Sequence, residues 1–149
     1  MFKIMFALHL LFAIFAIGPL VHATTTAARG LRHADAAATQ ASARMTRVYA
    51  IASILVIIFG FALMSATSPY THKEVAKFSE TWIWLSLLLW LIAMALALAL
   101  TAPALSSATK QITDGHSVGT LTARVAASGG AIALIFAAIV FLMVYQPGS

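Results

Sequence analysis

Two histidines near the start of the chain, His9 and His22, are the residues best suited to chemistry, because both lie in one long apolar run. Neutral imidazole is a good ligand for haem iron and for copper. A polar side chain at membrane depth usually faces the interior of a helix bundle. One hypothesis is therefore a haem or copper site that uses His9 with His22. The other is that His9 makes an interhelical hydrogen bond and that His22 lies at the membrane interface.

Helix geometry argues against a simple pair, although the spacing is similar to that of the paired histidines of membrane cytochromes b. Thirteen residues at about 100° each leave His9 and His22 about 140° apart around a straight helix. Gly18 and Pro19 lie between them and predict a kink, because proline removes a backbone hydrogen bond to Phe15. The other three apolar segments contain no histidine that would complete a haem pair. We therefore expect no cofactor, with haem or copper as the alternative.

A second group of metal-ligating residue types, His72, Glu74 and Glu80, falls in a polar connection. Histidine and carboxylates can hold a metal ion, but this spacing matches no defined motif, so we expect a solvated loop and no metal site. The sequence also has no Gly-rich phosphate loop, no HExxH and no nucleophile elbow. All four acidic residues lie in connections, whereas ion-coupled carriers need buried carboxylates or lysines. We expect a protein that is not an enzyme.

The composition indicates that lipid is the solvent of this chain. Of its 149 residues, 62% are hydrophobic and 9% are charged, against about 25% charged in soluble domains. Four apolar segments of about 20 residues are each long enough to cross a hydrocarbon core of about 30 Å. They are 2–23, 48–66, 81–102 and 125–145. We predict an all-α polytopic membrane protein, with four transmembrane helices forming one bundle over residues 1–149.

The distribution of basic residues predicts the orientation. The connection 24–47 contains four arginines, and the connection 103–124 adds Lys110 and Arg124. The positive-inside rule places both connections in the cytoplasm, which puts the loop 67–80 and both termini outside a bacterial plasma membrane. Anionic lipid headgroups explain the net charge of +5 better than nucleic acid does. The first segment resembles a signal peptide, but its apolar run exceeds the usual 7–15 residues, so we expect a retained helix.

Two expectations concern the ends of these helices. The connection 24–47 is rich in alanine, the best helix former, so the first helix is expected to continue past the membrane, with Gly30 as its break. Its second half is expected to form a short helix that leads into the second span. Pro103 is expected to end or kink the third helix.

Small residues recur at helical spacing in the fourth segment. Gly129, Ala133 and Ala137 form one smooth strip, and Ala126 and Gly130 form a second. Such strips let helix backbones approach closely in lipid. They indicate either packing within the bundle or contact with a partner protein.

The run LHLLFAIFAIGPLVHATTTAARG resembles the start of small, uncharacterised predicted integral membrane proteins with four helices, through His9, Gly18, Pro19 and Arg29. The layout is also distantly similar to that of copper-resistance D type membrane proteins. This resemblance implies four helices and no established activity, and the chain departs from the copper-resistance pattern because its later helices lack histidine. Some small bacterial membrane proteins of this size are accessory subunits of respiratory supercomplexes, an analogy of architecture only.

The sequence thus favours a non-catalytic accessory or assembly subunit of a larger bacterial membrane complex, with a respiratory oxidoreductase supercomplex as the best single hypothesis. Its partners would be other integral membrane subunits and the lipid bilayer. The alternatives are a haem- or copper-handling membrane protein that uses His9, and a small oligomeric channel or transporter.

Overall fold

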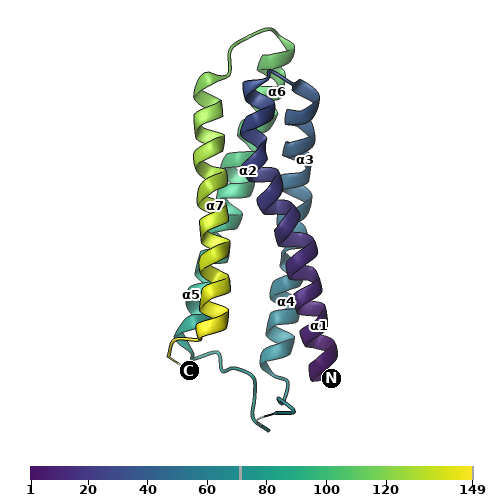
Figure 1. The fold of residues 1–149 in the computed structure, drawn as a ribbon, viewed down its shortest axis with the longest axis vertical. Helices are drawn as coiled ribbons and strands as arrows, with labels where there is room; N and C mark the ends of the chain where they lie inside the picture. The colour runs from purple at the N-terminus through teal and green to yellow at the C-terminus, as the bar shows by residue number, and fades with distance from the viewer. Residues whose placement is uncertain (71, 149) are drawn as a thin grey trace.

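The computed structural model describes residues 1–70 and 72–148, and it contains four long helices, each antiparallel to the next along the chain (Figure 1). Each is long and apolar enough to cross a membrane. Their bounds are Phe2–Arg32, Ala36–Met64, Thr81–Thr113 and Gly119–Tyr145. The described residues form no strand, only an isolated bridge between Thr67 and Glu74. The prediction of an all-helical chain with four apolar helices is confirmed.

Three of the four helices are divided into shorter elements. The elements are α1 (Phe2–Phe12), the π segment η1 (Ala13–Ile17), α2 (Gly18–Arg32), α3 (Ala36–Ala52), α4 (Ile54–Met64), α5 (Thr81–Ala95), the π segment η2 (Leu96–Thr101), α6 (Ala102–Thr113) and α7 (Gly119–Tyr145). Figure 1 shows the two chain termini at one end of the molecule, together with the connection between α4 and α5. We call this the terminal end. The opposite end, which contains the turns 33–35 and 114–118, is called the arginine end.

The helices at the arginine end extend beyond the apolar segments. This was expected for the first helix, which reaches Arg32, and for the start of the second, whereas the helical extensions of the third and fourth helices into 103–113 and 119–124 were not expected. The connection expected at 24–47 is helical except for 33–35, and the one expected at 103–124 is helical except for 114–118. Residues 24–32 alone lengthen the first helix by about 14 Å. Alanine accounts for part of this extension through its helix propensity. Asp35 starts α3, because its side chain accepts a hydrogen bond from the Ala38 backbone N–H at 2.9 Å.

Two residues expected to interrupt helices do not end them. Gly30 stays inside α2, where its missing side chain admits a neighbour: a Cβ there would lie 3.1 Å from the Thr39 Oγ1. Pro103 lies in the first turn of α6, and the third helix continues to Thr113. The expected break at Gly30 was wrong, because packing against Thr39 accommodates the glycine. At Pro103 the helix does not end; of the two expected outcomes the structure has a distortion, the π segment η2 shortly before the proline.

The two prolines within helices each follow a π segment. Pro19 comes after η1 and Pro103 after η2, and each occupies the first turn of the next α segment. The wider π turn removes the strict i−4 pairing that proline cannot make, so the chain stays helical while its axis changes direction. The distortion expected at Gly18 and Pro19 takes this form. In Figure 1 the first helix leans away from α7 toward the terminal end.

The arginine-end half has an interior rich in alanine, completed by leucine and valine. The elements α2, α3, α6 and α7 enclose one core. Its buried members are Ala27, Leu31, Ala43, Ala104, Leu105, Ala108, Val118 and Val125. The Thr101 hydroxyl of η2 donates to the Ser128 Oγ of α7 at 2.9 Å, and the Ser128 hydroxyl donates within α7 to the Val125 carbonyl at 3.1 Å. These bonds satisfy buried hydroxyls that lipid would leave unpaired.

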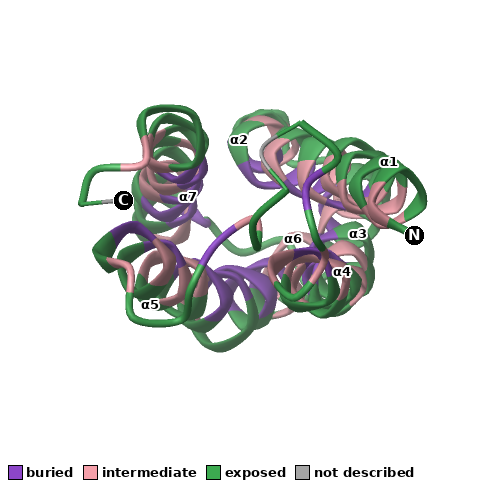
Figure 2. Ribbon diagram, turned by 90° about the horizontal axis from the view of Figure 1, so that it is seen from below, coloured by how far each residue is buried: buried purple, intermediate pink, exposed green. Residues whose placement is uncertain are grey.

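The terminal-end half separates into two pairs of helices. There α1 packs on α4, and α5 packs on α7. Seen from below, the buried residues lie on the inner faces of these helices (Figure 2). The two pairs are joined by a core at mid-height that includes Leu20, Met94, Ile132 and Phe136. Beyond that core, toward the terminal end, the α1–α4 pair and the α5–α7 pair diverge.

The small-residue strips of α7 face different surroundings. Gly129 is buried against the backbone of α2, and a Cβ there would collide with the Thr24 carbonyl oxygen. Gly130 and Ala137 are exposed, whereas Ala126 and Ala133 are half-buried. Close packing of α2 on α7 therefore requires glycine at 129 and sets no such requirement at 130.

We expect Gly129→Ala to lower the apparent melting temperature of the detergent-solubilised protein, because the new methyl group forces α2 and α7 apart. Overpacking of this kind destabilises by about 1–3 kcal/mol. Gly130→Ala is the matched control, because a Cβ there meets no described atom within 4 Å. It should be neutral or stabilising, since alanine is favoured over glycine in helices by about 0.5–1 kcal/mol. Equal melting temperatures for the two variants, followed by circular dichroism, would contradict this account of the contact.

Candidate functional site

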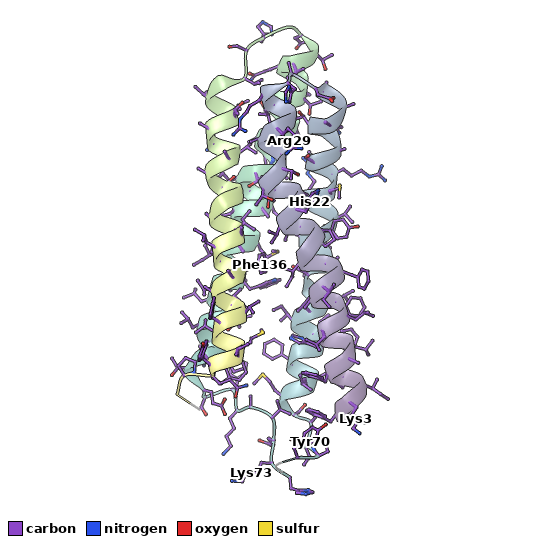
Figure 3. All side chains as sticks on the ribbon, viewed as in Figure 1. Lys3, His22, Arg29, Tyr70, Lys73 and Phe136 are labelled. Atoms are coloured by element: carbon purple, nitrogen blue, oxygen red, sulfur yellow. The ribbon has the colours of Figure 1, made fainter. Side chains whose placement is uncertain are left out.

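A cavity of about 420 Å³ lies between the α1–α4 pair and the α5–α7 pair, in the terminal-end half. Its lining is almost entirely apolar and comes from both pairs. Val75 and Ala76, from the connection between α4 and α5, line it as well, and Ala76 is buried. Six aromatic side chains contribute to the walls: Phe2, Phe6, Phe61, Trp82, Trp90 and Phe136. In Figure 3, Phe136 points from α7 into the space between the helices.

Three polar side chains, His9, Ser86 and Gln146, accompany the apolar lining. Among the described residues that line the cavity, none carries a formal charge. Ser86 is 7% exposed, and its Oγ has no hydrogen-bond partner among the described residues. An apolar pocket with a few convergent polar groups is the common form of a small-molecule site.

His9 contacts α4 through both a hydrogen bond and close packing. Its Nδ1 lies 3.0 Å from the Val56 carbonyl oxygen. A carbonyl oxygen only accepts, so Nδ1 carries the proton and donates; in the neutral imidazole Nε2 is then the acceptor. Gly60 provides the room for this ring, because a Cβ at that position would lie 3.2 Å from the His9 Cε1. His9 is therefore oriented by α4 while its side chain lines the cavity.

Trp90, a residue of the cavity lining, is held by Ser53, which lies between α3 and α4. The Trp90 Nε1–H donates to the Ser53 Oγ at 3.1 Å. The Ser53 hydroxyl in turn lies 2.6 Å from the Ala50 carbonyl oxygen and 3.3 Å from the Met94 Sδ. These contacts connect α5 to the second helix and hold the indole of Trp90 in place at the cavity wall.

His22 lies elsewhere. It is exposed on α2 and lines a separate polar groove at the arginine-end half with Arg29, His33 and Asp35. In Figure 3, His22 and Arg29 lie on the arginine-end side of Phe136. Thirteen residues of helix rise separate His9 from His22 by about 20 Å along the chain. The structure does not bring the two histidines together, so one cofactor held by both has no geometric support.

The structure does not bring His72, Glu74 and Glu80, from the predicted solvated loop, together as a metal site. Glu80 accepts hydrogen bonds from the Lys77 backbone N–H at 3.0 Å and from the Trp82 Nε1–H at 2.6 Å. His72 is exposed, with a φ of 55°. Within 1–70 and 72–148, no three His, Cys, Asp or Glu side chains form a group that fits a metal ion.

Sequence reasoning missed the cavity and most of its lining. Ser86 is the only hydroxyl residue between Trp82 and Leu100 in the third apolar segment, and Trp90 follows it by one helical turn. The spacing of Ser86 and Trp90 places both on one face of the helix but does not identify which helices or cavity that face contacts. Ser53 and Phe136 carried no such signal, because their roles depend on contacts between helices.

No family model, no curated protein and no solved structure matches this chain. The resemblance to copper-resistance D type membrane proteins therefore stays a prediction.

The contact between α1 and α4 can be tested by a double-mutant cycle. Gly60→Ala should lower stability by about 1 kcal/mol, because the methyl group displaces the His9 ring and weakens its bond to Val56. In a His9→Ala background the same change should be neutral or stabilising, since the ring is gone and alanine favours the helix. Thermal unfolding in detergent measures both. Purely additive effects of the two substitutions would show that His9 does not occupy the space beside Gly60.

Proposed function

We propose that this chain is a non-catalytic integral membrane protein that binds an apolar molecule between the α1–α4 and α5–α7 pairs. The observation that carries the proposal is the cavity itself, with about 420 Å³ of space and an aromatic and aliphatic lining. Small-molecule sites usually enclose about 300–1,000 Å³ and are lined in this way. The space is much smaller than a transmembrane helix, which favours a small guest over a partner helix.

The chemistry of the lining supports binding rather than catalysis. Catalysis of acyl, phosphoryl or proton transfer requires an activated nucleophile, an acid–base pair or fixed charges at the reacting atoms. The described lining offers one imidazole that is already bonded to α4, one serine hydroxyl and one amide. The Ser86 hydroxyl has no base within hydrogen-bond reach, so nothing activates it as a nucleophile.

The orientation in the membrane follows from the arginines. Arg29, Arg32, Arg44 and Arg47 lie toward the arginine end, and the positive-inside rule supports a cytoplasmic location for it. Under this orientation the termini face outward and the cavity lies in the outer half of a bacterial plasma membrane. A lipid-soluble guest then enters from the bilayer.

An accessory role in a larger complex is the second candidate, and one observation favours it. Gly130 and Ala137 lie exposed on the outer face of α7, and nothing described lies within 4 Å of a Cβ built on Gly130. A helix of another subunit packs closely on such a surface. Copurification in mild detergent tests this candidate. A companion polypeptide lost on Gly130→Leu would support it, whereas a homogeneous isolated chain would oppose it. A respiratory partner stays a sequence-based hypothesis.

The haem or copper alternative has one supporting feature, because the Nδ1–H bond of His9 to Val56 leaves Nε2 available as a ligand. A stoichiometric Soret band or bound copper in the purified chain, lost on His9→Ala, would favour it over the binding of a metal-free apolar molecule.

The binding proposal predicts that one molecule of decylbenzene associates with each chain. Native mass spectrometry after release from phosphatidylcholine nanodiscs counts the bound molecules. Leu87→Trp should weaken binding at least about tenfold, because the indole fills space that Leu87 lines. Leu88→Trp is the matched control, since Leu88 is 54% exposed and lies outside the lining. Absence of a decylbenzene adduct in the unaltered protein, or equal losses in the two variants, would count against the proposal.

A further inference from the structure

Two of the three polar side chains of the lining, Ser86 and His9, come from opposite walls of the cavity. Ser86 belongs to α5 and lies about 8 Å along the helix from Thr81, by helix rise. His9 belongs to α1 and lies about 10 Å along the helix from Phe2. Both helices start at the terminal end (Figure 1). A guest between the two pairs therefore meets a polar group on each side.

Among the described residues, two buried hydroxyl groups have no hydrogen-bond partner, those of Thr46 and Ser86, and only Ser86 lines the cavity. Ser53 and Ser128 each donate back to a carbonyl of their own helix, at 2.6 Å to Ala50 and at 3.1 Å to Val125. Ser86 makes no such bond, although it is more than nine-tenths buried. A hydroxyl left unpaired in an apolar interior is unfavourable, and a guest oxygen removes this penalty by accepting its proton.

The His9 ring provides the complementary group. Its Nδ1–H is used by the Val56 carbonyl, so the neutral ring offers an acceptor at Nε2. The cavity thus presents a hydroxyl donor from α5 and an imidazole acceptor from α1. These groups suit a guest with one oxygen that accepts and one hydroxyl that donates.

The rest of the lining restricts the guest further. The absence of formal charge among the described lining residues disfavours phospholipid and fatty-acid headgroups, whose buried charge would have no counter-ion. The six aromatic side chains favour a planar ring, because aromatic faces and edges pack well against another flat ring. The volume of about 420 Å³ accommodates a ring with the first part of a tail.

Building on the proposed function, we infer that the cavity binds a neutral quinone or quinol ring with an apolar tail. A ring carbonyl accepts a hydrogen bond from Ser86, and in the quinol a ring hydroxyl donates to His9 Nε2. The tail continues along the aliphatic wall toward lipid. Binding alone is inferred, without electron transfer.

The test compares three probes by native mass spectrometry from phosphatidylcholine nanodiscs: decylbenzoquinone, decylbenzene and 1-decanol. We expect decylbenzoquinone to bind most tightly. Ser86→Ala should weaken its binding about 3- to 10-fold, the range expected for one hydrogen bond, while decylbenzene binding changes less than about twofold. Ser107→Ala, at an exposed position on α6, is the matched control and should change neither.

Two further readings keep the inference separate from folding and from the proposed function. Ser86→Ala should keep or raise the melting temperature, because it removes an unpaired buried hydroxyl. A fourth probe, decylbenzoquinol, tests the contact with His9: His9→Phe retains a ring and should weaken the binding of decylbenzoquinol more than that of decylbenzoquinone. If decylbenzene or 1-decanol binds as well as the quinone, and Ser86→Ala affects all three alike, the ring inference is wrong and the cavity holds any apolar guest. If none of the probes binds, the proposed function itself fails.

Discussion

The close approach of α2 and α7 at Gly129 is the contact on which the rest of the molecule depends. The four helices are long and apolar enough to cross a membrane. In a membrane, lipid supplies little hydrophobic drive for helices to associate, so packing of small residues must hold such a bundle together. At Gly129 the backbone of α7 rests against the backbone of Thr24. Alanine-rich surfaces on α2, α3 and α6 extend this tight packing to the arginine end. That half is therefore the closely packed base from which the other half projects.

The cavity follows from this base together with two changes of helix type. The π segments η1 and η2 precede Pro19 and Pro103 and let each helix change direction without ending. Between these π segments and the terminal end, α1 packs on α4 and α5 packs on α7. Side chains on the facing walls are aromatic and aliphatic, and they leave room between the pairs. The site is thus a product of helix direction rather than of a sequence motif.

The sequence was sufficient for the class of fold and insufficient for the site. Low charge and four apolar segments indicated four helices that suit a membrane, and the structure has them. The helix ends were harder, because alanine favours helix at 24–47 whereas the arginines and threonines there suggested a connection. Gly30 is an example. It stays within α2 where Thr39 of α3 packs against it, and local sequence rules do not predict this contact between helices.

The same limit explains why Ser86 was overlooked. Helices that are apolar on every side carry no periodic signal for which face is buried. A lone serine in such a run is visible, but its lack of a partner is a property of the surrounding helices. His9 was recognised as a polar group within a span, yet its bond to Val56 depends on the pairing of α1 with α4.

The separation of the molecule into a tight half and a divided half has a mechanical consequence. The α1–α4 and α5–α7 pairs are joined through the core of the arginine-end half and are separate at the terminal end. A small rotation at the joined end becomes a larger displacement at the terminal end, in proportion to the length of each pair. The connection between α4 and α5 limits how far the terminal ends of the two pairs separate. Its residue Ala76 is buried and lines the cavity between them. The width of the opening between the two pairs is therefore the dimension that such a rotation changes most.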